Sequence, residues 1–235
     1  MDKIRLQLFM ARSGAGSRRK CEEFIAGGRV RINGKIVTTQ GSKVSEEDQI
    51  TLDGKTLHPV KKKVYLAVHK PTRYICSNTD DQNRPLTSDL FKEAVNIRLF
   101  HVGRLDFLSS GLIFYTNDGE FSRLVSHPSS GIEKVYSVES KNEIPDAVLE
   151  SYLKGITIEG VKYKLKSYSR KTANNVLFTL EEGKNREIRH VFSHFRLTVK
   201  RIHRVRIGIV TIRGIPPGAY RFLSQKEIMW FKKLN

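Results

Sequence analysis

The chain has 235 residues, with 42 Lys and Arg against 24 Asp and Glu, so its formal net charge at neutral pH is +18. Apolar residues make up 39% of the sequence, which supplies a hydrophobic core and excludes an intrinsically disordered basic tail. So large a positive charge indicates a polyanionic partner. Nucleic acid is favoured over a membrane surface, because no apolar run approaches the ~18 residues of a spanning helix.

The positive charge is concentrated near the C-terminus. Residues 183–235 contain 13 basic and 2 acidic side chains, a net charge of +11, whereas residues 1–60 carry +4 and residues 61–182 carry +3. This concentration predicts one face or groove that binds phosphates. The sequence has two cysteines, Cys21 and Cys76, and no CxxC pair, so we expect neither a disulfide scaffold nor a structural zinc site, and a reducing cytoplasm as the location.

The N-terminal quarter is predicted to form a small helix–helix–strand module. Apolar residues at helical spacing indicate a short amphipathic helix over residues 3–13. Ser17 is placed to cap a second helix, which ends at a Gly-Gly pair. Alternating residues then predict strands, one over residues 30–32 before an Asn-Gly turn and a later one over residues 49–53 before an Asp-Gly turn.

The rest of the chain is expected to hold mixed strands and helices. Lys61-Lys62-Lys63 is compatible with a linker and equally with a solvated charge run beside a strand. Apolar or alternating segments predict strands over residues 64–68, 112–115, 161–165 and 176–180. The apolar residues between Ile188 and Phe195 predict about three helical turns. Alternation over residues 205–209 predicts a strand with one buried face and with Arg204 and Arg206 exposed on the other.

Basic residues surround the turn between the two N-terminal helices. Helix N-termini attract phosphate, although a solvated helix start explains the same composition equally well. Ser17-Arg18-Arg19 and residues 25–35 (IAGGRVRINGK) resemble the RNA-binding module named after ribosomal protein S-four, over about residues 3–54. The resemblance implies RNA contacts at the positions that match the family's basic surface. These are Arg12, Ser17, Arg18, Arg19, Arg29 and Lys35.

A second group of polar residues precedes the strand predicted at residues 112–115. Residues 101–106 read His-Val-Gly-Arg-Leu-Asp, which places an acid beside an arginine in a loop bracketed by glycines. Such a loop next to a buried strand is typical of a functional site on a rigid scaffold. From these residues alone, a structural ion pair between Arg104 and Asp106 is the favoured interpretation.

The motif Gly103-Arg104-Leu105-Asp106, followed by Ser-Gly-Leu at 110–112 and Thr-Asn-Asp-Gly at 116–119, resembles the signature of pseudouridine synthases. It is most similar to the Rsu-type branch, which modifies small- and large-subunit ribosomal RNA. Three further segments match that branch in the expected order, namely residues 66–71, 133–136 and 182–189. Phe107-Leu108-Ser109 departs from a more polar stretch of the branch, and Glu187 replaces a glutamine.

This resemblance covers nearly the whole chain and implies an α+β fold. A small helix–helix–strand RNA-binding domain is expected over residues 1–60. A larger catalytic domain is expected over residues 61–235, built on a mixed, mainly antiparallel β-sheet with flanking helices.

The reaction of the family defines what the site residues must do. Pseudouridylation breaks the N1–C1′ bond of a uridine, turns the base and joins C5 to C1′. The resemblance implies that Asp106 is the essential carboxylate, acting either as nucleophile or as base. We expect Arg189 to be its ion-pair partner, with Arg186 as the second candidate. Tyr136 would pack against the uracil, and Ile188 would form the opposite wall, although the helical spacing of Ile188 is more often typical of a core residue.

A uridine inside folded RNA must be flipped out to be reached. The resemblance implies that Arg104 fills the gap that the base leaves. The other candidate substrate- or RNA-binding residues in this part of the chain are Lys70, Lys184, Arg204 and Arg206.

The expected partner is ribosomal RNA, free or within a pre-ribosomal particle. No membrane, cofactor or metal is expected, and we expect a monomer. The alternative to an enzyme is a non-catalytic ribosomal-RNA-binding or ribosome-assembly protein that retains the fold. A metal-dependent nuclease is disfavoured, since no carboxylate or histidine cluster has ligand spacing.

Overall fold

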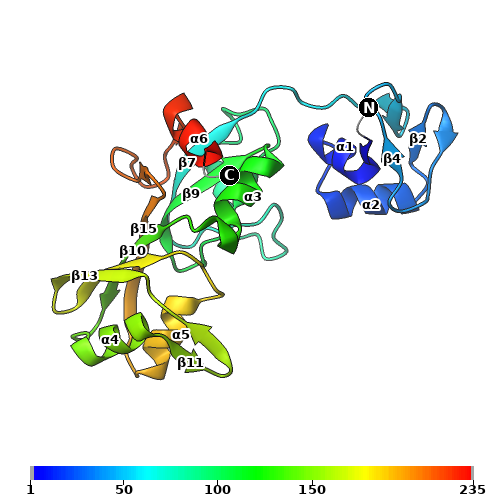
Figure 1. Ribbon diagram of the computed structural model, residues 1–235. Coiled ribbons are helices and arrows are strands. Elements are labelled where there is room, and N and C mark those ends of the chain that lie inside the picture. The colour runs from blue at the N-terminus through cyan, green and yellow to red at the C-terminus, as the bar shows by residue number, and fades with distance from the viewer. Residues whose placement is uncertain (1–2, 234–235) are drawn as a thin grey trace. The chain divides into compact units, whose positions relative to one another are not determined.

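The structure is a computed structural model that describes residues 3–233 (Figure 1). The chain divides between Lys63 and Val64 into two compact units. No helix within the described range is both long and apolar enough to cross a bilayer.

The N-terminal unit contains the two predicted helices, α1 (Leu6–Arg12) and α2 (Arg18–Ala26). The Oγ of Ser17 accepts a hydrogen bond from the backbone N–H of Lys20 at 3.1 Å, which confirms the predicted helix cap. A small sheet has the order β3-β2-β5-β6, and a separate pair joins β1 to β4. The bounds are β1 Ile4–Arg5, β2 Val30–Ile32, β3 Lys35–Ile36, β4 Lys43–Val44, β5 Ile50–Leu52 and β6 Lys55–Thr56.

The first predicted helix begins later than the sequence pattern indicates. Ile4 and Arg5 form β1 and pair with Val44 and Lys43, so the helix starts at Leu6. The pairing satisfies backbone groups that the first helical turn would leave without partners. Both predicted two-residue turns are present, with Asn33 and Asp53 at positive φ as such turns require.

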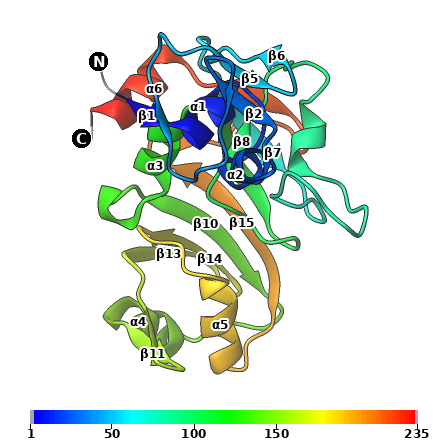
Figure 2. The ribbon, with the colours of Figure 1, turned by 90° about the vertical axis from the view of Figure 1, so that its right-hand side faces the viewer.

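The larger unit is built on a nine-stranded sheet (Figure 2). Its main path runs β13-β14-β10-β15-β9-β7-β17, with β8 paired to β9 and β16 paired to β15. All its recorded pairings are antiparallel except that between β9 and β15. The strands are β7 Tyr65–Lys70, β8 Phe100–Val102, β9 Ser110–Thr116, β10 Lys134–Ser140, β13 Ser167–Thr172, β14 Asn175–Leu180, β15 Val199–Ile207, β16 Val210–Thr211 and β17 Tyr220–Phe222.

The helices and small elements of this unit lie at the two ends of the sheet. Helices α4 (Asp146–Lys154) and α5 (Glu187–His194) lie at the β13 end, and α3 (Gly119–Ser126) and α6 (Gln225–Lys232) lie at the β7 end (Figure 2). The remaining elements are the 3₁₀ turns Thr87–Leu90 and Pro128–Ser130 and the hairpin β11 (Ile156–Ile158) and β12 (Val161–Tyr163). The α+β class and the mixed, mainly antiparallel sheet are as predicted, although the strand expected over residues 161–165 ends at Tyr163.

Burial differs between the two halves of the sheet. Every residue of β7 and β9 is buried, because alternate side chains enter separate hydrophobic cores on opposite faces. Strand β14 alternates between buried and half-buried residues, so its core side chains enter the single core that also contains residues of α4 and α5. The two regimes meet at β15, which joins β9 on one side to β10 on the other.

The junction between β9 and β15 depends on one glycine. Gly111 has φ +119° and lies opposite Arg204 in the parallel pairing. A Cβ atom added at Gly111 would lie 2.3 Å from the carbonyl oxygen of Arg204 and 2.4 Å from its backbone nitrogen. The two strands can therefore approach this closely only if residue 111 has no side chain.

We predict that Gly111→Ala lowers the free energy of unfolding by about 3 kcal/mol, since it combines backbone strain with a clash against main-chain atoms. Gly119→Ala is the matched control, because Gly119 begins α3 and an added Cβ would have no neighbour within 4 Å. Urea denaturation of the two variants measures the difference. Equal stability of the variants would contradict this explanation of the close approach.

Candidate active site

A cavity opens where β10 and β15 meet the start of α5. Its walls come from the loop between β8 and β9, from β10 and β15, and from the segment 183–189. Its volume is about 150 Å³, and a cavity of roughly that size can hold a benzene-sized ring. Among the predicted residues, those that line it are Arg104, Asp106, Tyr136, Lys184, Arg186, Ile188, Arg189 and Arg204.

Asp106 and Arg189 face each other in this cavity. The Nε of Arg189 lies 3.6 Å from Oδ2 of Asp106. The same guanidinium donates through Nη2 to the carbonyl of Leu108 at 3.3 Å and to Oγ of Ser109 at 3.4 Å, so it is anchored to the loop that carries the carboxylate. Burial lowers the pKa of Arg189 from its ordinary value and the charge of Asp106 opposes that shift.

The ion pair leaves the carboxylate accessible. The Asp106 side chain is 35% exposed, and 3.6 Å is too long for a hydrogen bond. Arg186 lines the same cavity and begins α5 from a left-handed backbone conformation. The recorded ion pair of Asp106 is with Arg189, and Arg186 acts on Arg189 as a neighbouring positive charge.

Lys70 is not an RNA contact, and that part of the sequence interpretation is wrong. Its side chain is completely buried at the end of β7. The ammonium group donates to the carbonyls of Pro71 at 3.0 Å, Asp106 at 3.1 Å and Ser109 at 2.6 Å. Lys70 therefore holds the two ends of the turn that presents the Asp106 carboxylate. Burial lowers its pKa to about 8, so it is mainly charged at neutral pH.

Arg204 is likewise not on the surface. Arg204 is only 3% exposed. A β-bulge between Val135 and Tyr136 of β10 shifts the register with β15, so Arg204 and Arg206 do not share the predicted exposed face. Its Nε donates to the carbonyl of Leu112 at 2.6 Å and its Nη1 donates to the hydroxyl of Tyr136 at 3.3 Å. The residue predicted to bind phosphate instead supports the tyrosine that lines the cavity.

Arg206 and Lys184 have protein partners of their own. Arg206 pairs with Glu133 at 2.9 Å, and Lys184 pairs with Glu182 at 3.2 Å. The sequence interpretation missed Lys134, whose ammonium donates to the carbonyls of Ile132 at 3.1 Å and Glu181 at 3.0 Å, and whose pKa burial lowers to about 8. Its place two residues before Tyr136, on the same strand face, is the signal that could have identified it.

Glu187 shapes the approach to α5. It is 5% exposed, accepts from the hydroxyl of Tyr152 at 3.0 Å and accepts from the backbone N–H of Lys184 at 3.1 Å. Burial raises its pKa above the ordinary value. Ile188, 4% exposed, both lines the cavity and belongs to the core, so its two interpretations are compatible.

The profile of the RNA pseudouridylate synthase family matches residues 64–194 of this chain. The chain belongs to that family. An uncharacterized RNA pseudouridine synthase of Borreliella burgdorferi is 39% identical over 98% of this chain and 96% of its own length. The ribosomal large subunit pseudouridine synthase B of Bacillus subtilis is 35% identical over 98% of this chain and 96% of its own.

A solved structure of a pseudouridylate synthase covers 97% of this chain and 99% of its own, with 28% identity and a TM-score of 0.71. The resemblance found in the sequence is thus confirmed, and the protein is a pseudouridine synthase, an isomerase of uridine in RNA. The S4 domain profile matches residues 4–50, which confirms the RNA-binding module at the N-terminus.

In the N-terminal unit of this pseudouridine synthase, some of the predicted RNA-binding residues are exposed and others are engaged by contacts within the protein. Helix α2 begins with Arg18, Arg19 and Lys20 and has no acid in its first turn, an arrangement that the helix dipole disfavours. Arg29 is paired with Asp53, with its Nε donating at 2.9 Å, and its guanidinium lies 4.5 Å from the ring centre of Phe24. Arg18, Arg19 and Lys35 are exposed, whereas Ser17 uses its side-chain oxygen to cap α2.

We predict that Lys70→Met lowers turnover roughly 100-fold while changing RNA affinity less than about twofold. The reason is that small displacements of a reacting group are costly, whereas Lys70 does not reach the surface. Lys171→Met, at an exposed lysine of β13, is the control. Single-turnover kinetics and RNA titration separate the two effects, and a large loss of RNA affinity would restore the rejected surface role.

The same contacts predict a pH dependence. The neutral amine of Lys70 has fewer donors than the ammonium, so wild-type turnover should fall as the pH rises through about 8, where the buried group loses its proton. A pH profile of the single-turnover rate that stays flat from pH 7 to pH 10 would show that the charge of Lys70 is not needed.

Proposed function

We propose that this protein isomerises a specific uridine of ribosomal RNA to pseudouridine, by flipping the base into the cavity and acting on it with Asp106. The observation that carries the proposal is the joint placement of Asp106, Arg189 and Tyr136 around a cavity that fits one pyrimidine ring. Two relatives support ribosomal RNA as the substrate, since the synthases of Bacillus subtilis and Haemophilus influenzae are both named ribosomal large subunit pseudouridine synthase B.

The Asp106 carboxylate acts at the sugar or the base of the flipped nucleotide. In one role it attacks as a nucleophile, and in the other it removes the 2′ proton, and either role requires the ionised form. Arg189 faces the carboxylate from 3.6 Å without a hydrogen bond that would block the reacting oxygen.

Tyr136 holds the detached uracil while it turns. Its ring is 7% exposed, so its position is set by packing, and its hydroxyl accepts from Arg204. With that acceptor position occupied, the hydroxyl proton is available to a substrate atom. The half-buried Lys134 and the buried Arg204 favour negative charge on the base as the N1–C1′ bond breaks.

The basic residues outside the cavity bind the RNA backbone. Arg104 is exposed at the mouth of the cavity, two residues before Asp106, where it can occupy the space left by the flipped base. In the N-terminal unit, Arg18 and Arg19 lie in the first turn of α2, beside the N–H groups of the helix N-terminus. Positive side chains there destabilise the helix, but together with those N–H groups they attract a phosphate.

We propose that the protein is a monomer and is located in the cytoplasm. Its substrate is ribosomal RNA, either free or held in a pre-ribosomal particle. Cys21 and Cys76 are buried and form no disulfide within the described residues, as a reducing compartment permits.

We predict that Asp106→Asn abolishes pseudouridine formation and leaves the dissociation constant for ribosomal RNA within about twofold, because the amide keeps the shape but cannot act as base or nucleophile. The measurement is chemical adduct formation at pseudouridine followed by reverse transcription, with deletion of the gene to locate the modified uridine. Full activity of the variant would overturn the role of Asp106. Wild-type protein that binds RNA without modifying it would support the non-catalytic alternative.

RNA affinity should fall steeply with salt. A protein that neutralises about 6–10 phosphates loses roughly 1,000-fold or more in affinity between ~50 and ~200 mM salt. Replacing Arg18 and Arg19 by alanine should reduce the slope of log affinity against log salt by about one unit per lost phosphate contact. A titration series that shows no salt dependence would contradict phosphate binding.

A further inference from the structure

Two apolar side chains next to the catalytic carboxylate face solvent. Phe107 is 37% exposed and Leu108 is 58% exposed, whereas Leu105 and Ser109 on either side are buried. Among the exposed large hydrophobic residues of the described chain, these two alone are adjacent in sequence. Single exposed apolar residues are ordinary, so exposure by itself indicates no partner.

The loop that carries them is fixed from its inner side. The carbonyl of Phe107 accepts from the backbone N–H of Arg73 at 2.7 Å, and that of Leu108 accepts from Arg189 at 3.3 Å. The N–H of Ser109 donates to the carbonyl of Asp106 at 3.0 Å, which closes the turn that Lys70 also holds. Because the main-chain groups of this loop already form hydrogen bonds with the protein interior, the Phe107 and Leu108 side chains cannot turn into the core without breaking several of these bonds.

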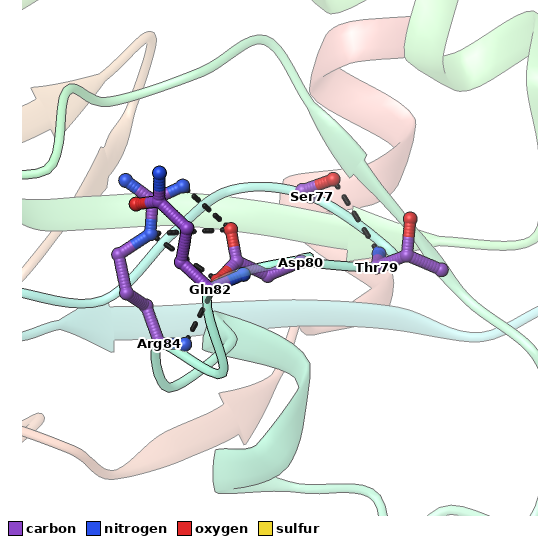
Figure 3. A network of polar contacts seen from close by, with 5 residues as sticks. All are labelled: Ser77, Thr79, Asp80, Gln82 and Arg84. Carbon is purple, nitrogen blue, oxygen red and sulfur yellow. Dashed lines mark hydrogen bonds and ion pairs between the residues drawn. The ribbon is translucent and has the colours of Figure 1, made fainter.

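A second structured loop presents a guanidinium to Phe107. The Cζ of Arg84 lies 5.9 Å from the centre of the Phe107 ring. Figure 3 shows the contacts that converge on Asp80, whose carboxylate accepts from the backbone N–H groups of Gln82 at 3.1 Å and Arg84 at 2.8 Å, and from Nη2 of Arg84 at 2.6 Å. The pKa of Asp80 is lowered to about 2 mainly by Arg84, so the anchor stays charged. Asp80 thus orients the arginine that borders the exposed ring.

We propose that Phe107, Leu108 and Arg84, together named the Phe107 platform, bind an unpaired nucleobase that flanks the target uridine on the same RNA strand. Aromatic rings and guanidinium planes both stack on the face of a base, which is how proteins hold splayed single-stranded RNA. The Nη1 of Arg84 has no recorded partner in residues 3–233, so it can donate to the phosphate or base edge of that nucleotide.

The position of the platform determines the occupant. Phe107 and Leu108 directly follow Asp106, so whatever covers them lies beside the nucleotide being modified. Exposed Arg73 and Arg104 flank the same loop, which favours an anionic chain over an apolar peptide segment. The inference rests on the proposed function, because the occupant belongs to the RNA that supplies the target uridine.

The test measures binding and stacking separately from chemistry. The probe is a stem-loop transcript of the mapped target, with 2-aminopurine placed in turn at each nucleotide flanking the uridine, whose fluorescence reports stacking. Phe107→Ala should weaken binding roughly tenfold and lose the stacking signal at one flanking position, and Phe107→Trp should restore both. Phe222→Ala, at a residue of β17 that is 59% exposed, is the matched control and should bind as wild type.

A double-mutant cycle identifies the base. If the platform stacks on a flanking nucleobase, an abasic site at that position should weaken wild-type binding about as much as Phe107→Ala does, and should have no further effect on the variant. Additive losses at every flanking position, or wild-type affinity in Phe107→Ala, would overturn the proposal. Wild-type affinity in Phe107→Leu would also overturn it, since leucine keeps the apolar surface without the aromatic face.

Failure of the proposed function would look different. If the wild-type protein binds and stacks the transcript but forms no pseudouridine, the chemistry assigned to Asp106 fails while the platform stands. If pseudouridine forms at the normal rate and Phe107→Ala changes neither affinity nor fluorescence, the platform fails alone.

Discussion

The buried ammonium group of Lys70 is the contact on which the active site depends. Its donors reach the carbonyls of Pro71, Asp106 and Ser109; the lysine side chain is completely buried, and the bond to Ser109 is buried at both ends. Charged donors in such surroundings make strong bonds, and a carbonyl that lost its partner there would remain unsatisfied. These bonds hold the turn from Asp106 to Ser109, whose carboxylate lines the cavity while Phe107 and Leu108 face solvent.

The close approach of β9 and β15 places Arg204 against the Tyr136 side chain that lines the cavity. Gly111 permits the approach, and Arg204 then lies beneath Tyr136 with its guanidinium bonded to both a main-chain carbonyl and the tyrosine hydroxyl. Burying cations is unfavourable unless they are hydrogen-bonded, and Arg204 and Lys70 are both bonded in this way. The basic side chains that line the cavity outnumber its two carboxylates, Asp106 and Glu187, and this surplus of positive charge suits a polyanionic substrate.

Local signals predicted local structure well. The cap at Ser17 and the Asn-Gly turn are present because each depends on residues within one or two turns of chain. Helix α5 likewise follows from its apolar spacing. The start of α1 was misplaced because β1 pairs with β4, a strand almost 40 residues away, and no local pattern encodes that pairing. Arg204 was placed on the surface for a related reason, since strict alternation cannot anticipate a β-bulge.

The sequence by itself determined the family, the two-part organisation and the polyanionic partner, and it predicted Asp106, Tyr136 and Arg189, which line one cavity. These follow from motifs and composition, which are properties of the chain read in order. Only the tertiary structure decided which basic residues can meet RNA and which are internal supports. Lysine and arginine have the same chemistry at both kinds of position, and the distinction between Lys70 and exposed Arg104 arises from what distant strands bring against them.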